Sequence, residues 1–431
     1  MGGTQHTQVL IVGAGPAGSA LGAYLARAGI SCLIAEAETF PRPHVGESLV
    51  PAANRVFREI GFLDRMLASD FVLKHGAAWT LPRSGALEHD WEGIPEDCRI
   101  EFKERPQPGV GEAHTWHVDR GRFDEMLARH AAEQGVEVRF GAAVTDVRFD
   151  ADGVTAELGG GGRVRCELIV DAGGRRTFLG ARLGLKVMDP LFDQYAVHAW
   201  FRGFDRGARN PDHLFVHFLE APGSWIWQIP VSAEVTSIGL VTQKLRLRER
   251  RSSPEGLFFE LLAQRPELAE RVRGSERVNA FKVEADYSYE MKEFCGDRFL
   301  LIGDAARFVD PIFSSGVSIA LNGARFAGRA IVESFRRGDF SRSAFAEFEA
   351  SLRVGTRNWK RFIQVYYALN VLFTWCIGRE EYRAQILQLL QGDVYDETVP
   401  VLDRLEALVR DVARDPRHLW HSRLNKDFVR G

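Results

Sequence analysis

The chain has 431 residues, of which 45% are hydrophobic and 26% are charged, and its formal net charge is −3. These values are typical of a folded globular protein with more than one structural unit, because single cores stop growing near about 250 to 300 residues. They exclude a mostly disordered chain, and the lack of a basic surplus argues against a nucleic acid or an anionic membrane as a partner.

Cysteine usage and the apolar segments predict a cytoplasmic protein. The five cysteines are odd in number and scattered, without a C-x-x-C pair to hold zinc, so we expect a reducing compartment and no metal site. The first residues lack the charged and apolar regions of a signal peptide. The longest apolar stretch, about 365–377, is shorter than the roughly 18 residues of a membrane span, and we expect it to be a buried helix.

The N-terminal segment predicts a βαβ unit. A strand at 8–15 is followed by a helix at 16–29 and a second strand at 31–38. Gly13, Gly15 and Gly18 form G-x-G-x-x-G at the turn between strand and helix. Such glycines let the main chain approach a pyrophosphate at the positive end of a helix, so the pattern predicts a dinucleotide site. A purely structural tight turn is the alternative.

Glu36 supports the dinucleotide interpretation. It closes the second strand, 23 residues after Gly13. At that position a carboxylate accepts hydrogen bonds from the hydroxyl groups of the adenosine ribose.

The middle of the chain alternates between the two types of element. A helix at 52–67 precedes an irregular excursion at 81–115, and an amphipathic helix at 122–135 leads into strands over 136–174. Residues 186–284 are mostly strands with aromatic side chains, which predicts an antiparallel sheet.

The last part of the chain predicts a return to the first sheet and then helices. A helical piece at 253–272 is inserted in the aromatic strands, residues 298–311 return to strand and turn, and helices run from 316 to about 420. We therefore expect three domains: a discontinuous dinucleotide-binding domain, a substrate-side sheet domain and a helical C-terminal region. Their ranges are 1–80, 110–185 and 285–345 for the first, 81–109 and 186–284 for the second, and 346–431 for the third.

Four segments in order resemble those of the FAD-dependent group A aromatic hydroxylase superfamily. They are the glycine fingerprint, "HVDRGRFD" at 117–124, "VDAGG" at 170–174 and "GDAARFVDP" at 303–311, and the resemblance covers most of residues 7–335. It implies an α/β fold with an FAD-binding Rossmann-like domain of the glutathione-reductase type, an antiparallel substrate-side sheet and a helical C-terminal region. A second Rossmann fingerprint is missing from the sequence, so reduced FAD is expected from a separate flavin reductase.

The resemblance also assigns residues to the cofactor. They are Gly13, Gly15, Ala17, Gly18, Glu36, Ser48, Arg120, Asp304 and Pro311. For Arg120 a structural ion pair is the alternative.

Within that superfamily, residues 225–230 form W-x-W-x-I-P, which resembles the signature of flavin-dependent halogenases. The resemblance implies that Trp225 and Trp227 are gatekeepers, which keep the substrate away from the flavin hydroperoxide, and that Ile229 and Pro230 lie on the substrate side. The alternative is a strand that places both indoles on one face of a packed core, since residues i and i+2 share a side.

Two further segments match the halogenase pattern. "GESLVP" at 46–51 is followed by "FVLKHGAAW", in which Lys74 occupies the position of the family's catalytic lysine, although a lone lysine is usually solvated. Phe308, Pro311, Ser314 and Gly316 fit F-x-x-P-x-x-S-x-G, and main-chain N–H groups at Ser315 and Gly316 are candidates for a halide nest.

Phe313 departs from the tryptophan halogenases, which carry a glutamate at its position, so the phenol and pyrrole branch fits better. Phe313 is expected on the substrate side. The base that removes the ring proton is not identified. Glu47 is a candidate, and a carboxylate that stabilises the start of a helix is the alternative.

The resemblance implies an FADH2-dependent halogenase of natural-product biosynthesis. Chloride or bromide would attack the flavin C4a-hydroperoxide to give hypohalous acid, which Lys74 would direct to an electron-rich ring. The substrate would be a phenol or pyrrole, free or tethered to an acyl or peptidyl carrier protein. The alternatives are an aromatic hydroxylase, which would not depend on Lys74, and a flavin-binding protein without turnover.

Overall fold

The computed structural model describes residues 4–81, 97–220, 223–244, 253–285 and 288–429. The excursion expected at 81–115 is therefore described in part, and its residues 82–96 lie outside the described residues.

A six-stranded sheet carries the dinucleotide fingerprint. Its strands, in spatial order, are β21 (Cys295–Gly296), β22 (Phe299–Leu301), β12 (Leu168–Asp171), β2 (Val9–Val12), β3 (Cys32–Ala35) and β8 (Glu137–Arg139). All of its pairs are parallel except β21–β22. Strands β2, β3, β12 and β22 are buried throughout, and their apolar sequences reflect cover on both faces.

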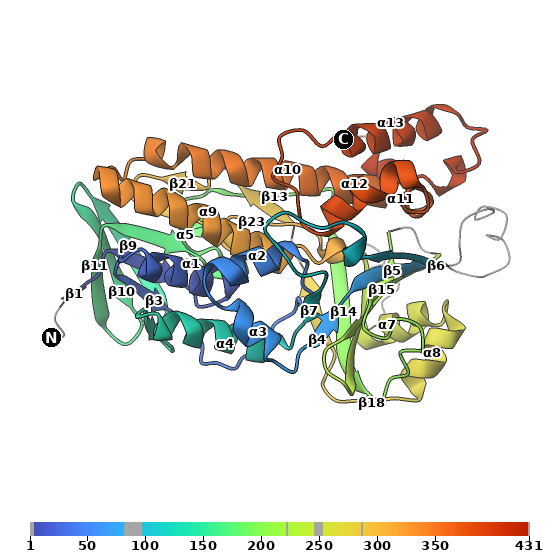
Figure 1. Cartoon of the computed structure of the whole chain (residues 1–431), viewed down its shortest axis with the longest axis horizontal. Helices are drawn as coiled ribbons and strands as arrows, with labels where there is room; N and C mark the ends of the chain where they lie inside the picture. Colours follow the sequence, from blue (N-terminus) through green and yellow to red (C-terminus); the bar gives the residue numbers. More distant parts are fainter. Residues whose placement is uncertain (1–3, 82–96, 221–222, 245–252, 286–287, 430–431) are drawn as a thin grey trace.

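Helices cover one face of this sheet and a second sheet covers the other (Figure 1). The helices are α1 (Pro16–Arg27), α4 (Arg120–Glu133) and α9 (Gly316–Arg337), and α1 packs against the other two. The second sheet has the order β1 (Thr4–His6), β11 (Gly162–Cys166), β10 (Gly153–Leu158) and β9 (Val144–Asp150). Strands β10 and β11 contact β12 and β2.

The parallel register determines which residues meet at the edge of the sheet. Val12 pairs with Ala35 and with Asp171, and Asp171 pairs with Leu301. The residues that follow these strand ends include Gly13, Glu36 and Asp304. They therefore lie at one carboxyl edge, where open α/β sheets bind ligands.

A third and larger sheet carries the two tryptophans of W-x-W-x-I-P. Its order is β18 (Glu276–Arg277), β14 (Gln194–Arg202), β17 (Val235–Gln243), β16 (Trp225–Pro230), β15 (Leu214–Phe218), β5 (Gly76–Thr80) and β6 (Asp97–Glu101), with β19 (Lys282–Ala285) also on β14. The pairs are antiparallel as expected, except that β5 and β15 run parallel. Strand β5 joins this sheet, whereas the expected boundary assigned residues up to 80 to the dinucleotide-binding domain.

The two faces of this sheet pack against different helices. Trp225, Trp227 and Ile229 share a hydrophobic cluster with the C-terminal helices, whereas Ile226 and Leu240 pack with α7 (Pro254–Leu262) and α8 (Pro266–Arg273). This alternation is the period of two of a strand that is covered on both sides.

The C-terminal region is helical, as expected, and lies along α9 and over one end of the large sheet (Figure 1). Its α-helices are α10 (Ala346–Ala368), α11 (Asn370–Ile377), α12 (Glu380–Leu390) and α13 (Pro400–Arg414). The apolar stretch expected as one buried helix is buried but divided at Leu369, whose extended backbone interrupts the helix. Among the described helices none is long and apolar enough to cross a membrane.

Two other expected helices are also divided. The segment 52–67 forms α2 (Ala52–Glu59) and α3 (Leu63–Leu67), because Gly61 takes a φ of 75° between them. The segment 253–272 forms α7 and α8, and Pro266 begins the second of them.

Short elements complete the described chain. They are the strands β4 (Val72–Lys74), β7 (Thr115–His117), β13 (Lys186–Met188), β20 (Tyr289–Met291) and β23 (Arg307–Phe308), the helix α5 (Phe178–Arg182), and 3-10 helices at Phe102–Glu104, Gly174–Arg176, Gly303–Ala305, Pro311–Phe313, Arg342–Phe345, His421–Arg423 and Lys426–Phe428.

Candidate active site

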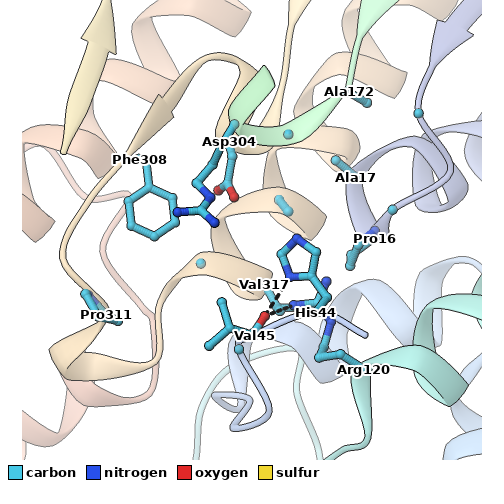
Figure 2. A pocket seen from close by; sticks show the side chains of 18 of the residues that line it. Pro16, Ala17, His44, Val45, Arg120, Ala172, Asp304, Phe308, Pro311 and Val317 are labelled. Atoms are coloured by element: carbon cyan, nitrogen blue, oxygen red, sulfur yellow. Dashed lines mark hydrogen bonds between the residues drawn. The ribbon is translucent and has the colours of Figure 1, made fainter. Parts of the chain in front are cut away.

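A cavity of about 540 Å³ lies where the carboxyl edge of the parallel sheet meets the large sheet. Figure 2 shows Ala17 and Ala172 on one side of it, Asp304, Phe308 and Pro311 on another, and Arg120 at the bottom of the view beside His44 and Val45. The expected site residues in its lining are Gly13, Gly15, Ala17, Glu36, Ser48, Arg120, Trp225, Trp227, Ile229, Asp304, Pro311, Ser315 and Gly316. The remaining four, Gly18, Lys74, Pro230 and Phe313, lie outside the lining.

The three glycines of the fingerprint have different local roles. Gly13 has a φ of 96°, and a Cβ there would lie 2.7 Å from the main-chain oxygen of Ala172. A Cβ on Gly18 would lie 2.0 Å from the oxygen of Gly13, so these two glycines permit close backbone packing. Gly15 precedes the first turn of α1 and meets no atom closer than 3.6 Å, which leaves the helix terminus open to the cavity. This geometry fits a diphosphate group.

Glu36 is fixed at the end of β3 by main-chain donors. Its Oε2 accepts a hydrogen bond from the Ala14 N–H at 2.7 Å, and its Oε1 accepts one from the Glu38 N–H at 2.9 Å. Its carboxylate lines the cavity beside the glycine turn, as a ribose ligand requires.

Arg120 forms the ion pair that was the alternative to a cofactor role. Its Nε and Nη2 donate to the two carboxylate oxygens of Asp124 at 2.8 and 3.0 Å, and its Nη1 donates to the Val45 oxygen at 2.7 Å. The guanidinium nevertheless lines the cavity, so the pair holds a positive charge at the wall.

Asp304 faces the same cavity from the other side (Figure 2). Burial raises the pKa of its carboxyl to about 6, against the field of Arg175, Arg120 and Arg307. None of the described residues donates a hydrogen bond to this carboxylate. This half-buried carboxylate faces the cavity without a donor among the described residues, and the hydroxyl groups of a ribityl chain would supply donors.

Lys74 lies behind the cavity wall and not in it. The side chain is 2% exposed, and its Nζ donates to the Ser48 hydroxyl at 2.8 Å and to the Leu49 oxygen at 2.7 Å. Burial lowers the pKa of Lys74 to about 7. The solvated lysine that was the alternative is therefore excluded, and Ser48 connects the lysine to the cavity.

The segment 308–316, here called the halide loop, runs from the cavity wall into α9. Ser314 takes the left-handed conformation with a φ of 56°, which turns the chain before Gly316 begins the helix. The Ser315 hydroxyl is buried and has no hydrogen-bond partner among the described residues. An unpaired donor beside free N–H groups at the start of a long helix can receive an anion.

The two tryptophans extend from β16 over the cavity. Their rings lie 6.0 Å apart between centroids, and both are almost fully buried. Trp225 Nε1 donates to the Tyr367 hydroxyl at 2.9 Å, and Trp227 Nε1 donates to the Ser237 hydroxyl at 3.0 Å. The core interpretation and the gate interpretation are compatible, because the indoles pack in a cluster and also line the cavity.

The three residues expected on the substrate side lie in different places. Ile229 lines the cavity, and Pro230 ends the same strand outside the lining. Phe313 packs into an aromatic cluster of the C-terminal helices, with its ring stacked on Phe362 at 4.3 Å between centroids.

Sequence reasoning missed Arg42 and Ser237 at this site, whereas it gave Tyr367 as one of the aromatic residues of 362–377 that either line the substrate chamber or pack in the core. Arg42 lines the cavity, and its Nη2 lies 3.6 Å from the point where a Cβ on Gly15 would be, so its charge is close to the glycine turn. Tyr367 and Ser237 hold the tryptophans but belong to no motif. Among the described residues no group of three or more His, Cys, Asp or Glu side chains could hold a metal ion.

Comparison with known proteins gives consistent matches. Residues 6–351 match the family described as FAD binding domain. The chain is 47% identical over 430 residues to the 1H-pyrrole-2-carbonyl-(peptidyl-carrier protein) chlorinase of Pseudomonas fluorescens strain Pf-5, covering 96% of both proteins. It is 30% identical over 394 residues to the corresponding brominase of Pseudoalteromonas luteoviolacea, covering 90% of this chain and 92% of that protein.

Among solved structures, the fold is similar to that of the flavin-dependent brominase Bmp2. The TM-score is 0.82 at 29% identity, and the match covers 95% of this chain and 100% of that one. The flavin-dependent halogenase CmlS matches with a TM-score of 0.77 at 27% identity, covering 95% of this chain and 72% of that one.

Proposed function

The chain belongs to the flavin-dependent halogenases of the FAD binding domain family, and from this premise we propose that it chlorinates a pyrrole-2-carbonyl group attached to a peptidyl carrier protein. The observation that carries the proposal is the 47% identity to a chlorinase of that substrate over 96% of both chains. The apolar Phe313 at the position of the glutamate in tryptophan halogenases argues against free tryptophan as the substrate. Reduced FAD is supplied by a separate flavin reductase.

The cavity residues that would hold FAD divide along its length. Glu36 takes the ribose hydroxyls, the Gly15 turn with Arg42 takes the diphosphate, and Asp304 takes the ribityl side. Reduced FAD, when bound, supplies the electrons for the reaction with oxygen that converts halide into hypohalous acid. The N–H groups of Ser315 and Gly316, together with the free Ser315 hydroxyl, hold the halide ion.

Lys74 presents hypohalous acid to the pyrrole. With a pKa of about 7, its ammonium form is available at neutral pH to donate a hydrogen bond to the oxygen of hypohalous acid. This polarises the oxygen–halogen bond, so that the halogen bonds to a ring carbon while the oxygen leaves and becomes water. The ring carbon then loses its proton to a base and regains aromaticity.

Trp225 and Trp227 exclude the pyrrole from the flavin side. Both indoles are buried at the cavity wall, so a ring that approaches the flavin through this wall must displace them. Oxygen transfer directly to the ring, which would make a hydroxylase, is thereby prevented.

Glu47 is poorly suited to be the base that removes the ring proton, because its Oε1 already accepts hydrogen bonds from Trp200 and Ser237 at 3.2 Å each.

The test is turnover with a flavin reductase, NADH and oxygen. Pyrrole-2-carbonyl carrier protein and free phenols are compared, with and without chloride or bromide, and products are read by mass spectrometry. We expect chlorinated pyrrole on the carrier protein, at least about 100-fold less of it with Lys74→Ala, and unchanged flavin oxidation. Lys103→Ala is the matched control, because Lys103 is 71% exposed.

The other outcomes have separate meanings. Halogenation of free phenols but not of the carrier-bound ring would overturn the substrate proposal and leave the family intact. A hydroxylated product that needs neither halide nor Lys74 would overturn the mechanism.

A further inference from the structure

Both gate tryptophans are connected to buried carboxylates in the same way. In each case the indole N–H donates to a hydroxyl, and that hydroxyl donates to an aspartate or glutamate. The two carboxylates belong to the two loops that border the cavity. Neither hydroxyl belongs to a sequence motif, yet each forms hydrogen bonds with both a tryptophan and a carboxylate.

The first connection joins three distant parts of the chain. Trp225 of β16 donates to the Tyr367 hydroxyl at 2.9 Å, and that hydroxyl lies 3.0 Å from both carboxylate oxygens of Asp310. Asp310 is the residue before Pro311 in the halide loop, and its Oδ1 also accepts a hydrogen bond from the Ile312 N–H at 3.0 Å. All three side chains are buried. Tyr367, in the last turn of α10, thus connects the gate to the halide loop.

The second connection leads to the other loop. Trp227 Nε1 donates to the Ser237 hydroxyl at 3.0 Å, and Ser237 donates to Glu47 Oε1 at 3.2 Å. Trp200 Nε1 donates to the same carboxylate oxygen at 3.2 Å. Glu47 immediately precedes Ser48, whose hydroxyl accepts the hydrogen bond of Lys74. Ser237 thus connects the gate to the loop that holds the catalytic lysine.

A hydroxyl is the group that this arrangement requires. An indole N–H can donate only, and a carboxylate can accept only, whereas a hydroxyl does both. Removing it leaves the buried indole N–H without an acceptor and takes one donor from the carboxylate, which costs more than the loss of one average hydrogen bond. The indole then loses the polar contact that fixes its orientation, and the loop carboxylate loses a donor.

We propose that Tyr367 and Ser237 are positioning residues, which fix the gate tryptophans relative to the halide loop and to the 46–51 loop that hydrogen-bonds Lys74. This inference rests on the proposed halogenation. Tyr367 sets the halide loop through Asp310, so its loss raises the KM for halide and lowers the yield of halogenated product per flavin oxidised. Ser237 acts through Glu47 on the lysine side, so its loss lowers the yield without changing the KM for halide.

The chain offers a matched control at the next residue. The Tyr366 hydroxyl is equally buried but has no hydrogen-bond partner among the described residues. Tyr366→Phe therefore removes the same atom from the same helix without breaking a bond. We expect Tyr367→Phe to lower the yield and raise the halide KM by at least about tenfold, the equivalent of a hydrogen bond to a charged group. Tyr366→Phe should stay within about twofold of the parent.

The assay starts from chemically reduced FAD and measures flavin oxidation and halogenated product separately over a range of chloride concentrations. Equal effects of Tyr367→Phe and Tyr366→Phe would overturn the proposal. If the parent oxidises flavin but halogenates nothing, the proposed function fails instead, and the two failures are thereby distinguished.

A double-mutant cycle gives an independent test. Trp225→Phe and Tyr367→Phe break the same bond, so the double variant should lose little more yield than Tyr367→Phe alone, whereas additive losses would overturn the connection. If Tyr367→Phe does not fold, Trp227→Phe and Ser237→Ala test the second connection in the same way.

Discussion

Gly239 provides the most direct test of how the gate is packed. It lies on β17 opposite Trp227 of β16, and a Cβ built on it would lie 2.1 Å from Cζ2 of that indole. Carbon atoms in contact are normally at least about 3.5 Å apart, so Gly239→Ala must move the ring edge by about 1.4 Å. The hydrogen bond from Trp227 Nε1 to Ser237, now 3.0 Å long, cannot survive a shift of that size away from the serine.

The expected cost has two parts. Overpacking a close-packed site costs about 1–3 kcal/mol, and the loss of the buried hydrogen bond adds about 1 kcal/mol. We therefore expect Gly239→Ala to lower the free energy of unfolding by roughly 2–4 kcal/mol. The gate is disturbed at the same time, so the halogenated product formed per flavin oxidised should fall while flavin oxidation continues.

The measurement compares Gly239→Ala with Gly274→Ala by chemical unfolding and by product yield. Gly274 ends α8 at a φ of −78°, and its nearest neighbouring atom would be 3.5 Å from an added Cβ, so a change of no more than about 0.5 kcal/mol is expected. Equal stability and equal yield for the two variants would refute the packing argument, because they would mean that the indole has room to move.

Three further outcomes follow from the site. Burial lowers the pKa of Lys74 from 10.5 to about 7, so the folded protein binds the lysine proton less tightly than the unfolded chain does. The charged lysine therefore destabilises the folded protein by an amount on the order of 4 kcal/mol at pH 6. This destabilisation fades as pH rises from about 7 to about 10. The stability advantage of Lys74→Met over the parent should therefore shrink between pH 6 and pH 9 in unfolding experiments, and a constant difference would contradict the buried charge. Gly13→Ala should abolish FAD binding, measured by fluorescence titration. Gly29 has a similar positive φ but no atom within 4 Å of an added Cβ, so Gly29→Ala should lose stability and still bind FAD. Loss of FAD binding in both variants would disprove the role of close packing at Gly13. Ser315→Ala should raise the KM for halide severalfold with little change in stability, because the buried Ser315 hydroxyl has no hydrogen-bond partner among the described residues. Ser288→Ala also removes an unpaired buried hydroxyl and should leave the KM for halide unchanged.

The parts of the site that could be predicted depend on local sequence and on strand direction. Gly13, Glu36 and Asp304 each follow a buried parallel strand, and the carboxyl ends of such strands meet at one edge. Their convergence on the cavity therefore follows from chain order once the strands are recognised. The fold class was predictable for the same reason, and it is confirmed by the structural similarity to flavin-dependent halogenases.

The parts that could not be predicted depend on packing between distant segments. Asp310 and Tyr367 are 57 residues apart, and their contact depends on where α10 ends, which Leu369 decides through its backbone conformation. The pairing of Lys74 with Ser48 and Leu49 also depends on the fold, because the residues beside Lys74 in the sequence carry no information about its partners. The prediction of one helix over 52–67 was wrong at Gly61, because the apolar pattern continues past this residue while its backbone leaves the helical conformation.

The C-terminal helices are not an interchangeable module. Tyr367 stacks on Phe428 at 5.2 Å between ring centroids, and Phe313 of the halide loop stacks on Phe362 of α10. A chimera that grafts the tail of a relative onto this core, in order to change its substrate, would therefore replace the supports of both the gate and the halide loop in a single exchange. Recombination between relatives should yield active hybrids when the donated tail keeps a hydroxyl at position 367 and an aromatic ring at position 362, and inactive ones otherwise.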